Sequence, residues 1–233
     1  MAILRDVETR AAAAAIRTKE HVCRRSPHDI SAAVDIWRGN ELVAVALPDQ
    51  HERSAILDLF AYAAAGFDAD AMAIVMESYV ACVDLQDLDR DSPEAEAAVL
   101  RANTNPMTGA LWALGEMADA VKHHDAIEKG WIEEAIVVSC ANRAGDITLK
   151  LLPFRYAGKH LVWKAERHLP DNGTAEGYFA DRMTKAMNAP SLSVAFNLPQ
   201  GELSREERDI EVAKEIMRLV PCRVALRGWQ LND

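Results

Sequence analysis

The sequence predicts an α+β fold, or a three-layer α/β sandwich, in which helices cover one mixed sheet. Residues 32–37 and 41–47 are β-type runs on either side of Gly39-Asn40, a pattern typical of an N-terminal hairpin. The chain ends with a strand, a helix and a strand, which suggests a right-handed β-α-β unit. Between them, short Gly-containing connections join three β-type runs and predict an antiparallel meander, over residues 132–141, 147–154 and 160–166.

Apolar spacing and capping residues predict the helices. Residues 3–22 carry apolar side chains at helical spacing together with an alanine run of high helix propensity. A second helix is expected between Asp49, as its cap, and Gly66. Ser204 and Glu207 have the spacing of a capping box. Further helices are expected over residues 92–102, 105–129, 174–187 and 205–219, and the last two strands over residues 191–197 and 222–227.

Residues 72–80 form the most apolar strand of the chain. Such a run is typical of a strand that is buried on both faces, so we expect it at the centre of the sheet. Glu77 interrupts it. A carboxylate at this position either lies near solvent at the end of the strand or is buried with a partner that alters its pKa.

Composition limits the classes of function. Half of the 233 residues are apolar, and no repeat or linker divides them, so a single domain over residues 1–233 is expected. The net charge of −10 argues against nucleic acid or an anionic membrane surface as a partner, because both carry negative charge. No apolar run approaches the length of a membrane span, about 18 residues. Four widely separated cysteines favour free thiols, and hence a soluble protein of the cytoplasm.

The candidate chemistry centres on carboxylates. Glu133 and Glu134 open the strand over residues 132–141, and if this strand adjoins residues 72–80, Glu77 and Glu134 could share a site. Nucleases that bind a metal on a central sheet use such pairs, but they also carry a (D/E)-x-K motif, which neither Lys150 nor Lys164 completes.

Histidine motifs give weaker signals. His123 and His124 are neighbours on a predicted helix and point about 100° apart, so each is read as a surface partner of an acid four residues away. His160 and His168 are expected on the solvent face of one edge strand, with Leu161 and Trp163 facing inward. The run Asp87-x-Asp89-x-Asp91 begins like a calcium loop but lacks the glycine and the final glutamate that such a loop requires.

Two stretches resemble a loose group of uncharacterised proteins from actinobacteria and their phages. They are the run of residues 66–79, which ends in Met76-Glu77-Ser78-Tyr79, and the run of residues 131–139 with its Glu133-Glu134, followed by the Gly145-Asp146 turn. The resemblance covers about 80 residues, and the His-Pro-Asp-Arg stretch of that group is replaced here by residues 122–129. It implies no activity and no site residue, and suggests only an accessory protein of a phage or mobile element.

Two functions follow as hypotheses. The favoured one is a non-catalytic binding or assembly protein of the cytoplasm that binds a protein partner or itself as a homo-oligomer, without a cofactor. Its basis is the lack of a recognised catalytic motif and the Met- and Ala-rich elements, which suit packing. The alternative is a metal-dependent hydrolase that uses a divalent metal, with Glu77 and Glu134 on central strands and help from His123 or His124.

Overall fold

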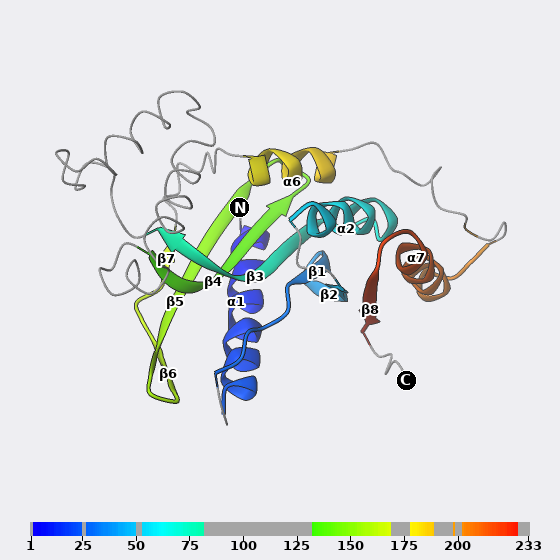
Figure 1. The fold of residues 1–233 in the computed structure, drawn as a ribbon. Coiled ribbons are helices and arrows are strands. Elements are labelled where there is room, and N and C mark those ends of the chain that lie inside the picture. The colour runs from blue at the N-terminus through cyan, green and yellow to red at the C-terminus, as the bar shows by residue number, and fades with distance from the viewer. Residues whose placement is uncertain are drawn as a thin grey trace.

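The computed structural model describes residues 2–24, 27–49, 53–81, 132–168, 178–188, 198 and 202–227. These residues form an α+β fold in which one eight-stranded sheet is covered by helices (Figure 1). The predicted fold class is therefore confirmed. Each described strand pair is antiparallel. The strand expected over residues 191–197, on which the β-α-β unit depends, lies outside the described residues.

The strand order is β6-β5-β4-β3-β1-β2-β8, and β7 pairs with β5 beside β6. β3 is thus central, as its apolar sequence predicts. The bounds are β1 Ala33–Arg38, β2 Glu41–Pro48, β3 Ala71–Ala81, β4 Ile132–Asn142, β5 Ile147–Ala157, β6 His160–Trp163, β7 Arg167–His168 and β8 Cys222–Leu226.

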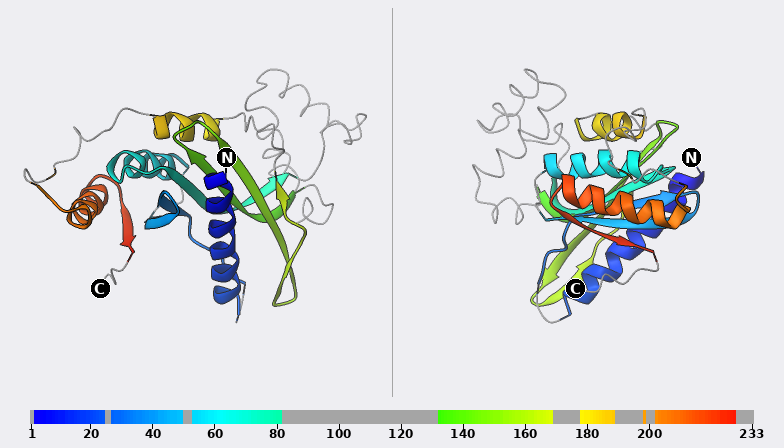
Figure 2. Two further views of the ribbon diagram at one scale, coloured as in Figure 1. Left: turned by 180° about the vertical axis from the view of Figure 1, so that it is seen from behind. Right: turned by 90° about the vertical axis from the view of Figure 1, so that its right-hand side faces the viewer.

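Helices lie on both faces of the sheet, so the three-layer description also applies (Figure 2). Helix α1, Ala2–Val22, packs on one face through an apolar stripe that includes Leu4 and Ala11. The opposite face contacts α2, Arg53–Gly66. Helix α6 packs against α2 and the interior strand β4, and α7 packs against α2 and the edge strand β8. Their bounds are Tyr178–Asn188 for α6 and Arg205–Leu219 for α7.

The pleat of β3 serves both cores at once. Ala71, Ala73 and Val75 belong to the core under α1, while Met72 and Ile74 belong to the core under α2. Side chains alternate between the two faces of a strand, so a strand with helices on both sides needs apolar residues at every position. This explains why Glu77, which continues the α1 face, is conspicuous in the sequence.

Local signals set the ends of several elements. Gly39 turns the β1–β2 hairpin with φ of 55°, and its amide donates to Asp70 Oδ2 at 2.7 Å. The capping box of α7 is present: the Ser204 hydroxyl accepts from the Glu207 amide, and the Glu207 carboxylate accepts from the Ser204 amide at 2.8 Å. Both features match the sequence-based expectation.

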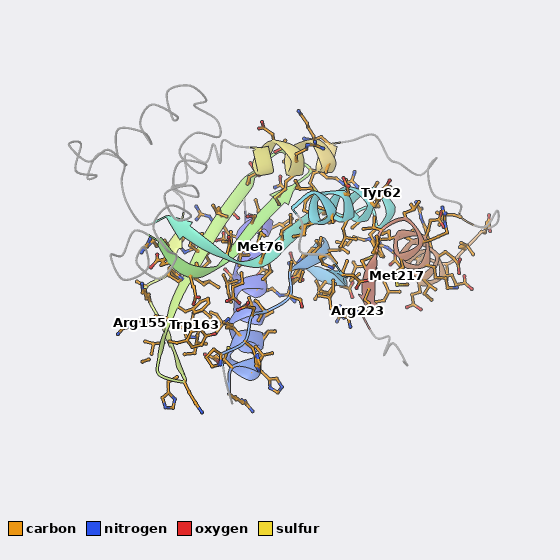
Figure 3. All side chains as sticks on the ribbon, viewed as in Figure 1. Tyr62, Met76, Arg155, Trp163, Met217 and Arg223 are labelled. Atoms are coloured by element: carbon orange, nitrogen blue, oxygen red, sulfur yellow. The ribbon has the colours of Figure 1, made fainter. Side chains whose placement is uncertain are left out.

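The expected strand over residues 160–166 is wrong in its extent. β6 stops at Trp163, where the Lys164 amide donates to the Pro153 carbonyl at 2.8 Å, and the chain re-enters the sheet as β7. His160 and His168 therefore lie on two separate strands, although both are exposed. Trp163 does face inward, toward α1, while Arg155 lies on the other side of the hairpin (Figure 3).

Within the described ranges, no helix is long and apolar enough to cross a membrane. The helices expected over residues 92–102 and 105–129, with His123 and His124, lie outside the described residues, as does the acidic run from Asp87 to Asp91. The single domain over residues 1–233 stays a prediction.

Candidate functional site

The candidate site is a pocket beside the C-terminal half of β3. β4 pairs with β3 along its whole length to Ala81, whereas the pairing with β1 ends at Ala33–Val75. The segment that leads into β1 passes this uncovered side, and a pocket of about 320 Å³ opens there. Its lining residues are Asp29, Ile30, Ala32, Ile56, Met76, Glu77, Ser78 and Glu134. Met76, near the centre of the molecule, is labelled in Figure 3.

The pocket brings together the two carboxylates expected to share a site. β3 and β4 are adjacent, and their register sets Glu77 opposite Ile136 and Glu134 opposite Tyr79. Residues two apart on a strand point to the same face, so Glu77 and Glu134 are diagonal neighbours on the α1 face. Both line the pocket. The predicted contribution of His123 and His124 falls outside the described residues.

Glu77 has a buried partner on α1. The ammonium group of Lys19 donates to Glu77 Oε1 at 2.7 Å, to Glu77 Oε2 at 2.8 Å and to the His28 carbonyl at 2.7 Å. The Lys19 side chain is 0% exposed and that of Glu77 is 12% exposed. An ammonium group has three donors, so all the donors of Lys19 are used. Glu77 is therefore a buried, paired carboxylate.

Aromatic rings complete the surroundings of Lys19. Its ammonium nitrogen lies 4.5 Å from the centre of the Phe154 ring and 5.5 Å from that of Tyr156, within the range of cation–π attraction. The Tyr156 hydroxyl is 3.3 Å from Cys23 Sγ. Burial and this contact raise the pKa of Tyr156, so the phenol stays protonated at neutral pH. The end of α1 is thus joined to β5 as well as to β3.

Opposing effects act on the pKa of Glu77. Burial is the largest and raises it, and the negative charge of Asp29 acts in the same direction. The hydrogen bonds from Lys19 and from the Ile30 amide, which donates to Oε2 at 3.0 Å, lower it. The net direction is upward. Asp29 is therefore close enough to Glu77 to affect its charge state.

These bonds restrict what Glu77 can do chemically. From the described residues, Oε1 accepts one hydrogen bond and Oε2 accepts two, out of about four acceptor sites on a carboxylate. To bind a metal ion or take a proton from a reactant, Glu77 would have to give up contacts with Lys19. Glu134 and Asp29 are the other carboxylates among the described residues of the lining.

Glu133 does not join this pocket. It is one residue from Glu134 on the same strand and therefore faces the opposite side of the sheet. There its carboxylate is paired with Lys164 at 2.8 Å and Arg167 at 2.6 Å. The Glu133-Glu134 motif is thus divided between two roles: one residue holds the chain between β6 and β7, and the other lines the pocket.

Two more buried carboxylates lie between α1 and the sheet without lining the pocket. Glu8 of α1 has Oε1 3.2 Å from His168 Nδ1. Asp35 of β1 is 7% exposed, and burial raises its pKa to about 6. Both carboxylates raise the pKa of the Cys140 thiol, after burial itself, and they therefore share one low-dielectric region under α1. Cys140 is buried, as its position in a strand predicts.

Lys19 and Glu8 are the polar residues that sequence reasoning missed. The buried stripe of α1 includes Leu4, Ala11 and Ala15, and Glu8 and Lys19 each follow a stripe residue by four positions. This spacing places them on the buried face of the helix. The signal was therefore in the periodicity, although charged residues at such positions are usually assigned to the surface.

In the part of the chain that the structure describes, no three His, Cys, Asp or Glu side chains are grouped closely enough to hold a metal ion. The candidate site is thus a mixed acidic and apolar pocket with a buried Lys19–Glu77 pair behind it. Comparison of the chain with models of known families, with curated proteins and with solved structures gives no match.

Proposed function

We propose that this protein is a non-catalytic binding protein whose pocket beside β3 receives a group from a protein partner or from a second copy of the chain. The observation that carries the proposal is the engagement of Glu77. Its two oxygens are held by Lys19 and the Ile30 amide, which makes this carboxylate part of the pocket wall.

The character of the lining supports binding over chemistry. Apolar side chains from α2, β3 and the segment before β1 stand beside carboxylates, a combination that can contact both an apolar body and a charged group. A general base must reach the proton it removes, and a metal ligand must direct a free lone pair at the ion. Lys19 donates to both oxygens of Glu77, so this carboxylate is already engaged and is poorly suited to either role.

The proposal includes the cytoplasm as the location and an accessory role in a phage or mobile element as the setting. The described cysteines, Cys23, Cys140 and Cys222, are free and buried, which supports a reducing compartment. The setting rests only on the sequence resemblance given above.

The test is site-specific photo-cross-linking of the full chain in the cells that produce it. A photoreactive residue at Ser78, in the pocket lining, should give a discrete adduct with one protein or with a second copy. The same residue at Asp58, which is exposed on α2, serves as the control and should give none. Light scattering of the purified chain distinguishes self-association from a different partner. Equal labelling at both positions would contradict the proposal.

The hydrolase alternative keeps one observation in its favour, since Glu77 and Glu134 line the same pocket. Its test is a thermal shift with Mg²⁺, Mn²⁺ or Zn²⁺, together with turnover of phosphoester and peptide substrates. A metal-dependent shift and turnover that are both lost in Glu134→Gln would favour the hydrolase over the binding protein. Glu206→Gln, on the exposed side of α7, is the matched control.

A further inference from the structure

We infer that His168 forms a pH-dependent latch between helix α1 and the edge of the sheet. In its charged form the imidazole ring bridges Glu8 and Glu166 and holds β7 in place, and loss of the ring proton opens the bridge. None of these three residues is among the described residues that line the pocket beside β3, so the latch is independent of the proposed function.

β7 is a short strand that is held by ion pairs on both faces of the sheet. In the described part of the chain it pairs with β5 over two residues. Successive side chains of a strand point to opposite faces, so its two side chains reach different partners. Arg167 pairs with Glu133 at 2.6 Å, and His168 Nδ1 lies 3.2 Å from Glu8 Oε1 of α1. Both carboxylate side chains are buried, at 5% and 7% exposure.

These two ion pairs respond differently to pH. The guanidinium group of Arg167 keeps its charge at every pH that a folded protein meets, so its pair with Glu133 is permanent. Histidine is the side chain whose charge changes between about pH 5 and 8. A rise in pH therefore weakens the attachment of β7 on the α1 face and leaves the opposite face unchanged.

The contacts of the His168 ring require both of its nitrogens to be donors. Nδ1 faces Glu8 Oε1 at 3.2 Å, and Nε2 faces Glu166 Oε1 at 3.4 Å. An ionised carboxylate only accepts hydrogen bonds, whereas a neutral imidazole has one donor and one acceptor nitrogen. In the neutral ring one nitrogen would direct its lone pair at a carboxylate oxygen. The bridge is thus complete only when the ring carries its second proton.

Glu8 is the member of the bridge that depends most on His168. Its Oε1 is buried and accepts no hydrogen bond from any other described residue. A buried carboxylate without a cation is unfavourable. Glu166 differs, because its side chain is 53% exposed and Lys150 pairs with it at 2.8 Å. Deprotonation of His168 therefore leaves Glu8 uncompensated between α1 and the sheet, whereas Glu166 keeps its partner.

The surrounding charges act on the latch in both directions. The charged groups that face His168 come from three elements, namely Glu8 of α1, Lys150 of β5 and Glu166 of the segment before β7. Lys150 opposes a positive ring, but Glu166 pairs with it. Beyond Glu8 lie the carboxyl of Asp35 and the thiol of Cys140. Burial raises the pKa of Asp35 to about 6, so above this pH Asp35 adds negative charge that favours the charged ring. The pKa of Cys140 is also raised, so its thiol stays neutral.

The experiment is urea unfolding of the full chain at pH 5.5 and pH 8.5. At pH 5.5, His168→Gln should raise the equilibrium constant for unfolding about fivefold, a charge-assisted contact discounted for the half-exposed ring. At pH 8.5 the same change should raise it less than about twofold, because the natural ring is then uncharged as well. His168→Lys keeps a positive charge at both pH values and should unfold less readily than the natural chain at pH 8.5. Titration of Asp35 is common to the chains compared and cancels.

Glu8→Gln removes the buried charge that the latch holds. In this background His168→Gln should have nearly the same effect at both pH values. His160→Gln is the matched control, since His160 is exposed on the neighbouring strand β6, and its effect should not change with pH.

Two results would overturn the inference: an effect of His168→Gln that is equal at pH 5.5 and pH 8.5, or a pH dependence that persists unchanged with Glu8→Gln. If Glu8→Gln does not fold, as judged by circular dichroism, His168→Lys decides the question. A chain with His168→Lys that is no more stable than one with His168→Gln at pH 8.5 would then refute the latch.

Discussion

Asp35→Asn should stabilise the protein at neutral pH. Asp35 lies in the middle of the sheet, opposite Ala73 of β3 and Val45 of β2, on the face that α1 covers. Among the described residues no hydrogen-bond donor compensates its burial, and burial alone raises the pKa of this carboxyl from 3.8 to about 6. The folded state therefore holds a proton at Asp35 more tightly than the unfolded chain does.

The sign and size of the effect follow from this shift. Between pH 3.8 and about 6 the folded state binds more protons at Asp35, so this group lowers the free energy of unfolding as the pH rises through that window. Each pKa unit corresponds to about 1.4 kcal/mol, so ionised Asp35 costs about 3 kcal/mol above pH 6. Asparagine has nearly the same shape and cannot ionise. It still buries a polar amide, which offsets part of the gain.

Urea unfolding followed by circular dichroism at pH 4, 5, 6 and 7.5 measures the effect. The variant should be more stable than the natural chain by about 1–3 kcal/mol at pH 7.5, and this difference should shrink steadily toward pH 4. Other carboxyls titrate equally in both proteins and cancel in the difference. Asp58→Asn, on the exposed side of α2, should show no such trend. A difference that does not change with pH, or a variant that is less stable at pH 7.5, would refute the reasoning.

Three other predictions concern features with different physical origins. Lys19→Met leaves the Glu77 carboxylate buried without its cation and should cost about 3–5 kcal/mol in urea unfolding, whereas Lys19→Met with Glu77→Gln should recover much of this loss; a neutral single variant would count against the pair. Ser204→Ala removes one half of the α7 capping box and should cost about 1 kcal/mol, seen as a lower Tm; an unchanged Tm would show that the cap is not used in solution. The Cys140 thiol is buried and its pKa is raised, so mass spectrometry after iodoacetamide at pH 8 should find it unmodified until urea unfolds the chain, and rapid labelling of the native protein would contradict its burial.

Local features of the fold were accessible from the sequence. The Gly39 turn, the Ser204 cap and the nearly continuous apolar run of β3 are encoded within short stretches, and the structure confirms them. The order of the strands is not local. β1 lies between β2 and β3, although the hairpin alone would allow either of its strands to meet β3. Which strand of the hairpin pairs with β3 depends on how the helices pack on the sheet. A short segment of sequence holds no information about that packing.

The site was predictable only in part, because one of its signals is local in the sequence and the others depend on contacts between distant segments. Glu77 drew attention because it breaks an apolar run, and the adjacency of β3 and β4 then brought it to Glu134. Its true partner, Lys19, comes from a helix 58 residues earlier. Helical spacing places Lys19 on the buried stripe, but only the docking of α1 across β3 reveals which carboxylate it meets. A contact of this sequence separation cannot be read from either segment alone.

Both charged residues on the buried stripe of α1 help to determine how the helix sits on the sheet. Glu8 lies against His168 near one edge, and Lys19 is paired with Glu77 of the central strand. A slip of α1 by one turn, about 5.4 Å, would keep alanines against the sheet but would move Lys19 off its carboxylate into apolar surroundings. Small residues such as Ala11 and Ala15 tolerate several registers, whereas a buried ammonium group tolerates only the one that supplies its acceptors. The Lys19–Glu77 pair that sets the register of α1 also holds Glu77 in the wall of the pocket. The position of Glu77 is therefore set when the chain folds and does not require a ligand.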